Sequence, residues 1–193
     1  MKKGLYKFLR VLAKILMKGF YRVEIIGKEN IPKEGSCLLC GNHKSNLDPI
    51  LLMAASNRLV HFVAKKELTD GKFGFFFKKL GLIPVDRSKK NPQVINECSK
   101  LLNEGEVVGI FPEGTFNKTE YVIMPFKIGA VKMSNNTDAP IVPFAIVNNY
   151  KLFRKSAKII FGKPYHIKDK LDLRKENITL MNKVIKLLKN ENN

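Results

Sequence analysis

The chain has 193 residues, of which 45% are hydrophobic, enough to bury the core of one ordinary domain. This composition excludes a disordered chain, a disulfide-stabilised miniprotein and a collagen-like repeat. The 35 Lys and Arg residues exceed the 17 Asp and Glu residues, and the net charge of +18 attracts phosphate, whether on nucleic acid, an anionic membrane or a small ligand.

The excess charge lies mainly at the two ends of the chain. Residues 1–22 carry a net charge of +7 with no acidic residue, residues 151–193 carry +8, and residues 23–150 carry only +3. No apolar run reaches the roughly 18 residues of a membrane-spanning helix. The first residues also lack the uninterrupted apolar stretch and small-residue cleavage site of a signal peptide.

Residues 1–20 form the first predicted element, a basic amphipathic helix. At about 100° per residue, five cations fall within an arc of roughly 80°: Lys3, Lys7, Arg10, Lys14 and Lys18. Apolar residues occupy the opposite side: Leu5, Phe8, Leu9, Leu12, Ile15, Leu16 and Phe20. The alternative is a surface helix docked on its own core, but the absence of acids from the polar face favours a helix in the membrane interface. Five interfacial cations contribute at most about 5 kcal/mol on an anionic bilayer.

The remaining chain alternates strand-like and helix-like segments. In chain order we expect a strand at 21–26, a strand at 36–40, a helix at 49–55, a strand at 60–64, a helix at 73–80, a strand at 83–85, a helix at 92–104, a strand at 107–111, a helix at 126–134, a strand at 141–147, a strand at 157–162 and a helix at 173–190. This alternation predicts an α/β fold: a single domain with a largely parallel mixed central sheet flanked by helices, plus the N-terminal basic amphipathic helix.

The first candidate site follows the strand at 36–40. His43 and Asp48 are five residues apart, so on one helix they would be separated by about 500° and could not share a face. A chain reversal brings them together if Ser45 or Asn46 caps the next helix and places Asp48 in its first turn. The carboxylate would then fix the imidazole tautomer and leave the other ring nitrogen free to accept a proton. Taken alone, an Asp in the first turn of a helix is also explained by its favourable interaction with the helix dipole. A single His near a loop is likewise more often a surface or core residue than a catalytic one.

Two further segments place polar residues after predicted strands. The turn Pro112-Glu113-Gly114-Thr115 follows the strand at 107–111, at the edge where open α/β sheets bind ligands. By itself it is also an ordinary turn with an exposed acid. Arg87 follows the strand at 83–85, where it is either a solvated charge or a bidentate partner for phosphate.

Together these segments resemble the glycerolipid acyltransferase family, in particular the bacterial 1-acylglycerol-3-phosphate acyltransferases. The matching blocks, in order, are Asn42-His43-Lys44-Ser45-Asn46-Leu47-Asp48 (the family's HX4D motif), Lys66-Glu67-Leu68 with Gly81-Leu82-Ile83-Pro84-Val85-Asp86-Arg87, Phe111-Pro112-Glu113-Gly114-Thr115, Pro125-Phe126-Lys127-Ile128-Gly129-Ala130 and Ile141-Val142-Pro143-Phe144. Their order and spacing agree over about residues 36–147.

The resemblance implies transfer of a fatty acyl group from acyl-CoA or acyl-carrier protein to the sn-2 hydroxyl of 1-acylglycerol-3-phosphate, giving phosphatidic acid in phospholipid biosynthesis. His43 would be the general base and Asp48 would orient it. This arrangement corresponds to a Ser-His-Asp catalytic triad in which the substrate hydroxyl takes the place of the enzyme serine. Backbone amides near the His43 loop or the Glu113–Thr115 turn would stabilise the oxyanion. The residues expected to bind substrate are Asn42, Ser45, Lys66, Arg87, Glu113, Gly114, Thr115 and Lys127.

Nothing in the sequence demands a metal or a redox cofactor, so we expect none beyond the acyl donor, which is a substrate. Residues 1–20 would be the membrane-interface helix and residues 21–193 the acyltransferase domain. The expected partners are an anionic phospholipid surface, the lysophospholipid acceptor and acyl-carrier protein, with no nucleic acid. The expected location is the cytoplasmic face of the cell membrane, as a peripheral or monotopic protein.

The chain departs from the family pattern at one position. The family usually has Arg directly after Glu-Gly-Thr, whereas this chain has Phe116, so the acceptor could instead be glycerol-3-phosphate or another lysophospholipid.

Two other interpretations of the sequence are a zinc site and a nucleic-acid-binding module. Cys37 and Cys40 have a zinc-like spacing near His43, but residues i and i+3 of a strand point to opposite faces, so we expect these thiols and Cys98 to fill the core. The isoelectric point above 9 also fits a nucleic-acid-binding module, although no recognition motif is present.

Overall fold

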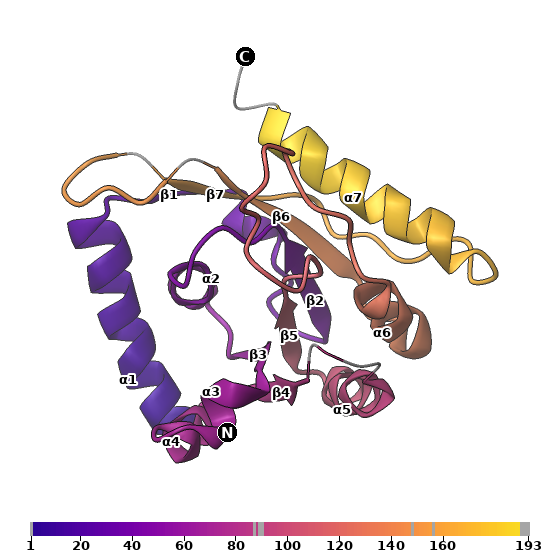
Figure 1. Ribbon diagram of the computed structural model, residues 1–193, viewed down its shortest axis with the longest axis horizontal. Helices are drawn as coiled ribbons and strands as arrows, with labels where there is room; N and C mark the ends of the chain where they lie inside the picture. The colour runs from indigo at the N-terminus through magenta and orange to yellow at the C-terminus, as the bar shows by residue number, and fades with distance from the viewer. Residues whose placement is uncertain (1, 87, 89–90, 148, 156, 190–193) are drawn as a thin grey trace.

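The structure is built around one mixed β-sheet. The computed structural model describes residues 2–86, 88, 91–147, 149–155 and 157–189, and within them seven strands pair in the order β1-β7-β6-β2-β5-β3-β4 (Figure 1). Their bounds are Glu24–Ile26 for β1, Cys37–Gly41 for β2, Val60–Lys65 for β3, Ile83–Val85 for β4, Val107–Ile110 for β5, Ile141–Val147 for β6 and Lys158–Phe161 for β7.

Five neighbouring strands, β6-β2-β5-β3-β4, run parallel to one another. Strand β7 is antiparallel to β6, and β1 is parallel to β7. The carboxyl ends of parallel strands meet at one edge of a sheet, where open α/β folds bind their ligands. The segments that follow β2, β3, β4, β5 and β6 therefore gather at the same edge. The predicted α/β class with a largely parallel mixed sheet is confirmed.

Helices cover both faces of this sheet (Figure 1). One face carries α1 (Lys3–Lys14), its continuation as the π-helix η1 (Ile15–Phe20), and α2 (Asp48–Ala55). The other face carries α5 (Pro92–Asn103), α6 (Gly129–Thr137) and α7 (Leu173–Lys189). Three short helices lie in the connections: η2 (Lys28–Asn30), α3 (Lys66–Asp70) and α4 (Gly74–Lys79).

The central strands are buried on both faces, which explains their nearly continuous apolar sequences. In β2, Cys37 and Leu39 belong to the core under α1 and α2, whereas Leu38 and Cys40 belong to the core under α5, α6 and α7. This alternation is the period of two expected for a strand. Strand β2 is thus held between two cores and is a firm base for the loop that follows it.

Most predicted elements are present, and the differences have local causes. The first strand begins at Glu24 because the helix continues to Phe20 and Arg22 adopts a left-handed backbone with φ of 47°. Helix α6 begins at Gly129 and not at 126, because the Lys127 amide donates to the Pro112 carbonyl at 2.8 Å. The short helices η2 and α3 were not part of the prediction.

The N-terminal helix has one face in the core and another in solvent. Tyr6 and Met17 are fully buried, and Ala13 is 6% exposed. The Tyr6 hydroxyl accepts the Val60 amide of β3 at 3.0 Å, which joins the helix to the sheet. On its outer face, apolar side chains are 46–61% exposed: Phe8, Val11, Leu12 and Ile15. None of the helices in the described residues has the length and apolar character needed to cross a bilayer.

Candidate active site

The end of strand β2 brings the first candidate residues to the carboxyl edge of the sheet. Gly41 pairs with Phe144 of β6, and a Cβ atom at Gly41 would lie 2.4 Å from the Phe144 ring, so there is no room for a side chain. Asn42 continues the pairing through its side chain: Nδ2 donates to the Ile146 carbonyl at 2.9 Å, and Oδ1 accepts the Ile146 amide at 2.7 Å. The resemblance predicts a substrate contact for Asn42, whereas both polar groups of this buried side chain bind β6. Asn42 therefore fixes where His43 leaves the sheet.

His43 and Asp48 form a buried pair just beyond this point. Nδ1 of His43 lies 2.9 Å from Oδ2 of Asp48, and the two residues are 6% and 0% exposed. The same oxygen accepts the backbone amides of Lys44 at 2.6 Å and Ser45 at 2.8 Å. Because an ionised carboxylate only accepts hydrogen bonds, this contact assigns the imidazole proton to Nδ1 and leaves a lone pair on Nε2. The predicted approach of the carboxylate to the imidazole is present.

The turn between the two residues differs from the prediction in its cap. Helix α2 begins at Asp48, but its N-cap residue is Leu47 and no side chain caps the helix. The predicted cap by Ser45 or Asn46 is wrong. Ser45 is half-buried, and its hydroxyl accepts the Leu47 amide at 3.2 Å, before the helix starts. The reversal is closed instead by the Asp48 carboxylate, which binds the amides of the loop that precedes it.

Glu113 connects the turn after β5 to the His43 loop. Its Oε1 accepts the His43 amide at 2.7 Å, and its Oε2 accepts the Met124 amide at 2.8 Å. The side chain is 3% exposed, and burial raises the pKa of this carboxyl above its usual value, against the opposite effect of the two amide bonds. The resemblance predicts that Glu113 binds substrate, whereas both of its oxygens bind backbone amides. Glu113 thus holds three segments of the site together.

Two aromatic rings enclose the imidazole of His43. Phe111 stacks on it with a centroid separation of 4.1 Å and an interplanar angle of 18°. Phe116 meets it edge to face at 4.5 Å. The residue that stands where the family usually has Arg therefore lies against the candidate base itself. It supplies an apolar wall and no positive charge.

The rest of the turn is less buried toward its end: Gly114 is half-buried and Thr115 is exposed. Gly114 has φ of 76°, a left-handed conformation that suits glycine, and a Cβ atom there would lie 2.9 Å from Cε of Lys127. Lys127 is therefore brought next to the turn, and its own amide donates to the Pro112 carbonyl. Thr115 is exposed beside Gly114. Among the predicted substrate residues, the structure brings Gly114 and Lys127 together, and Thr115 and Lys127 are exposed.

Lys66 is farther from the pair along the same edge. Lys66 begins α3 directly after β3, two strands from β2, which corresponds to about 10 Å. Its Nζ lies 3.8 Å from a carboxylate oxygen of Asp70, and both side chains are more than half exposed. Arg87 lies outside the described residues.

One close partner of the pair was not predicted. The Tyr150 hydroxyl donates to Oδ1 of Asp48 at 2.7 Å. The sequence signal was its position: Tyr150 follows β6, which is parallel to β2 and pairs with it up to Gly41. The segment directly after β6 therefore starts at the edge that carries His43.

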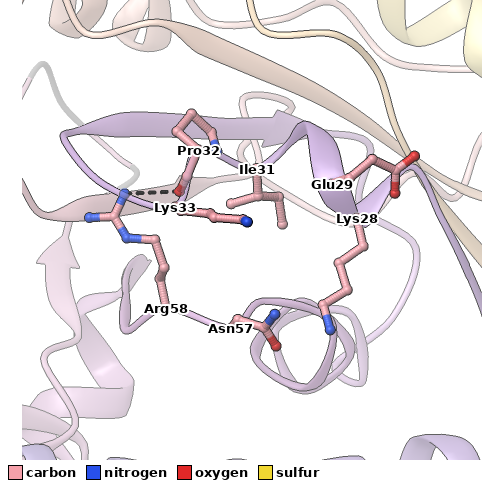
Figure 2. Close-up of a pocket in the computed structure, with 7 residues that line it drawn as sticks. All are labelled: Lys28, Glu29, Ile31, Pro32, Lys33, Asn57 and Arg58. Atoms are coloured by element: carbon pink, nitrogen blue, oxygen red, sulfur yellow. Dashed lines mark hydrogen bonds between the residues drawn. The ribbon is translucent and has the colours of Figure 1, made fainter.

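A separate hollow of about 420 Å³ lies at the opposite edge of the sheet, where the parallel strands begin (Figure 2). Its lining residues are Lys28, Glu29, Ile31, Pro32, Lys33, Asn57 and Arg58. The Arg58 guanidinium donates to the carbonyls of Pro32 at 3.2 Å, Gly105 at 2.8 Å and Gly35. Arg58 thus ties together the segments that precede β2, β3 and β5, and this hollow does not touch the His43 pair.

The three cysteines are buried and unpaired, as expected for core residues. Cys37 and Cys40 face the two different cores, which separates the thiols that have a zinc-like spacing. Burial raises the pKa of Cys37 to about 11 and that of Cys98 to about 12. In the described part of the chain no group of three His, Cys, Asp or Glu side chains is placed to hold a metal ion.

A histidine oriented by a buried carboxylate, with its second ring nitrogen unprotonated, can remove a proton from a bound hydroxyl. This geometry and the motifs around it agree with what comparison with known proteins finds. The acyltransferase family model matches residues 22–147, and the chain belongs to this family of acyltransferases.

Two relatives and one solved structure extend this result. The chain is 36% identical to the 1-acyl-sn-glycerol-3-phosphate acyltransferase of Bacillus subtilis (strain 168), over 97% of this chain and 98% of that protein. It is 32% identical to the probable 1-acyl-sn-glycerol-3-phosphate acyltransferase of Mycoplasma pneumoniae, over 74% of this chain and 56% of that protein. The crystal structure of the LPA acyltransferase PlsC of Thermotoga maritima matches with a TM-score of 0.76 at 18% identity, covering 98% of this chain and 81% of that one, which shows a shared fold.

Proposed function

We propose that this acyltransferase moves a fatty acyl group from an acyl thioester to the sn-2 hydroxyl of 1-acylglycerol-3-phosphate, giving phosphatidic acid. The observation that carries the proposal is the buried His43–Asp48 pair, with Nδ1 bound to the carboxylate at the carboxyl edge of the sheet. The acceptor class is supported by the names of the Bacillus subtilis and Mycoplasma pneumoniae relatives.

In this mechanism Nε2 of His43 takes the proton of the acceptor hydroxyl as its oxygen attacks the thioester carbonyl. Asp48 favours the imidazolium that forms. The tetrahedral intermediate then expels the thiolate, which receives the proton from Nε2, so the products are the new ester and the free thiol. No covalent acyl-enzyme and no metal or redox cofactor is required.

We assign stabilisation of the oxyanion of the tetrahedral intermediate to backbone amides of the turn that follows β5. The amides of His43, Lys44 and Ser45 already donate to carboxylates. In the part of the chain that the structure describes, the amides of Thr115 and Phe116 donate to no protein acceptor. These amides are therefore the donors we assign to the developing negative charge.

Lys127 is the cation we assign to the acceptor phosphate. It is exposed beside Gly114, and Phe116 leaves the site without the usual arginine. Lys66 lies at the same edge, and Arg87 follows β4 outside the described residues. Lys127→Ala should raise the KM for the acceptor several-fold with kcat nearly unchanged, whereas Lys132→Ala, an exposed lysine of α6, should change neither.

The decisive assay uses purified protein, labelled oleoyl-CoA and lysophosphatidic acid, with identification of the product. His43→Ala should lower the rate by about 10²-fold to 10⁴-fold with the melting temperature preserved, and the exposed His166→Ala should retain the wild-type rate. Near-normal transfer by His43→Ala would refute the mechanism. A panel with glycerol-3-phosphate and other lysophospholipids tests the acceptor, and acyl-carrier protein in place of CoA tests the donor. Salt-dependent binding to duplex nucleic acid without any acyl transfer would contradict the proposal as a whole.

We also propose that the protein rests on the cytoplasmic face of an anionic membrane through its N-terminal helix. Tyr6, Ala13 and Met17 face the core, so the exposed apolar side chains on the outer face of α1 are not needed for folding. Five cations flank that face with no acidic residue on the helix. This combination fits an interfacial helix that buries its apolar face and places its cations at lipid head groups.

Exposed aromatic residues extend this surface at both ends of the helix. At its start the Lys2 amide donates to the Lys79 carbonyl of α4, which carries Phe75 at 71% exposure. At its end Phe20 contacts Phe153, which is 61% exposed, with ring centroids 5.8 Å apart. The apolar surface therefore runs from α4 along α1 to the loop after β6.

The membrane proposal is tested with one isoleucine on each side of the molecule. Ile15→Asp removes an outer-face residue of the N-terminal helix that is 53% exposed, and Ile178→Asp removes a 58% exposed residue of α7, which covers the other face of the sheet (Figure 1). Burial of one such side chain contributes about 1.5–3 kcal/mol, so Ile15→Asp should weaken flotation with phosphatidylglycerol vesicles by roughly 10-fold to 100-fold. Ile178→Asp should not change it. Equal effects of the two variants would contradict the proposed surface.

A further inference from the structure

The carboxylate of Asp48 is held from both of its oxygens. Oδ2 accepts the imidazole of His43 and the amides of Lys44 and Ser45. Oδ1 accepts the hydroxyl of Tyr150 at 2.7 Å, across 102 residues of sequence. Tyr150 is thus a direct partner of the group that orients the candidate base, and the mechanism above does not use it.

This second bond restricts a motion that the first three leave possible. A carboxylate held only through one oxygen can still rotate about its Cβ–Cγ bond and swing its other oxygen. An O–H donor at 2.7 Å on that other oxygen fixes the carboxylate plane, and hydrogen bonds to an ionised acceptor are about twice as strong as neutral ones. Asp48 is 0% exposed, so solvent water does not compete for the position.

Tyr150 is suited to remain a donor. Burial first, and then the neighbouring Asp48 carboxylate, raise the pKa of its phenol well above the ordinary value. The raised pKa favours the neutral phenol, which is the form that donates to the carboxylate.

The ring of Tyr150 is itself held by the end of the N-terminal helix. Tyr21 meets it edge to face, with ring centroids 5.8 Å apart and an interplanar angle of 80°. Three residues beyond Tyr150, the Phe153 amide donates to the Phe20 carbonyl at 2.6 Å. The loop after β6 is therefore fastened to Phe20 and Tyr21 on one side and to Asp48 on the other.

We propose that Tyr150 is a positioning residue for acyl transfer: its hydroxyl fixes the Asp48 carboxylate in the plane that aligns His43 for proton removal. This inference rests on the proposed function, since His43 must be the base. It assigns Tyr150 no contact with substrate. Its effect should therefore appear in kcat and not in the KM of either substrate.

Tyr150→Phe tests the inference because it deletes the hydroxyl and keeps the ring against Tyr21. We expect kcat to fall by about 10-fold to 100-fold, with KM unchanged and the melting temperature within a few degrees of wild type. The matched control is Tyr165→Phe: Tyr165 is half-buried in the other core, and its hydroxyl has no partner among the described residues. That variant should keep the wild-type kcat. Incorporation of 3-fluorotyrosine at position 150, which retains the hydroxyl, should also preserve it.

Two readouts separate positioning from a general structural role. In an Asp48→Asn background, Tyr150→Phe should cause no further loss of kcat, because the carboxylate it orients is gone. In the wild type, the downfield NMR resonance of the His43 Nδ1 proton should be sharp, and in Tyr150→Phe it should shift upfield or broaden. The NMR measurement needs no turnover, so it tests Tyr150 even if the proposed acyl transfer fails with every acceptor.

The inference is overturned if Tyr150→Phe keeps the wild-type kcat and the wild-type Nδ1 resonance. It is also overturned if the losses from Asp48→Asn and Tyr150→Phe are additive, since the hydroxyl would then act elsewhere. If Tyr150→Phe melts far below wild type, kcat and the Nδ1 resonance are instead compared between the wild type, the protein with 3-fluorotyrosine at position 150 and Tyr21→Leu. Tyr21→Leu removes the ring contact that holds the Tyr150 side chain, so its hydroxyl would be held less firmly at Asp48, and the inference then requires a broadened Nδ1 resonance and a lower kcat.

Discussion

Glu113 offers the sharpest test of how the site is held in place. Replacement by Gln keeps the size of the side chain but converts one acceptor oxygen into an NH₂ donor. One of the two amides that Glu113 now accepts, that of His43 or that of Met124, must then face another donor. Glu113 is 3% exposed, so water cannot take over the lost bond.

The size of the effect follows from these two bonds. A buried donor without an acceptor costs about 1–3 kcal/mol, and loss of a bond to a charged acceptor adds a similar amount. Part of this is offset because burial disfavours the charged form of the Glu113 carboxyl and raises its pKa. We therefore expect a net loss of about 2 kcal/mol, which for a chain of this size lowers the melting temperature by roughly 4–8 °C.

Thermal unfolding followed by circular dichroism measures the stability, and the acyl-transfer assay measures kcat on the same samples. Because the His43 amide loses or weakens its partner, kcat should fall on the order of 10-fold. Glu120→Gln, an exposed acid in the same segment, is the control and should change neither quantity. A Glu113→Gln variant with wild-type melting and kcat would refute the view that this carboxylate organises the loop.

Two shorter predictions concern the sheet and the buried cysteines. Gly41→Ala should destabilise the fold by more than about 3 kcal/mol, because its Cβ would lie 2.4 Å from both the ring and the carbonyl oxygen of Phe144. Urea unfolding measures this loss, and a variant with the wild-type unfolding midpoint would show that β2 and β6 can separate there. The thiols of the folded protein should not react with Ellman's reagent at pH 8, because burial raises the pKa of Cys37 to about 11 and of Cys98 to about 12. All three cysteines should react in guanidinium, and rapid reaction of the folded protein would contradict their burial.

The sheet and its order along the chain were largely predictable from sequence. Apolar runs such as residues 107–110 and 141–147 lie between segments of helical period, and the structure has strands at those positions. The short helices η2 and α3 were not predicted, because three to five residues do not establish a period. The first strand was predicted too long, because nothing in the pattern shows that the helix continues as a π-helix to Phe20.

At the site, the sequence identified residue types better than it identified their contacts. The approach of Asp48 to His43 could be expected from the spacing and the need for a chain reversal. The side chains of Asn42 and Glu113 bind backbone groups 104 and 70 residues away, and only the folded sheet shows which strands those are. Tyr150 was missed for the same reason, since its bond to Asp48 depends on the path of a loop.

The outward face of α1 could be predicted only in part. Periodicity separates cations from apolar residues, but it does not show which apolar residues face the core. In the structure Tyr6 and Met17 are buried, whereas Phe8 and Ile15 on the same helix are exposed. Tertiary packing decides this division.

The attachment of the N-terminal helix at both ends has a consequence for the proposed membrane contact. Lys2 is bonded to Lys79 at the start of the helix and Phe20 to Phe153 at its end, with Tyr6 bonded to the sheet between them. A catalytic domain on a flexible linker samples many heights and tilts above a bilayer. Here three hydrogen bonds join the helix to the body of the protein at its start, its middle and its end. If the proposed membrane contact through α1 is right, these bonds would limit the orientations in which the edge that carries His43 can face the bilayer.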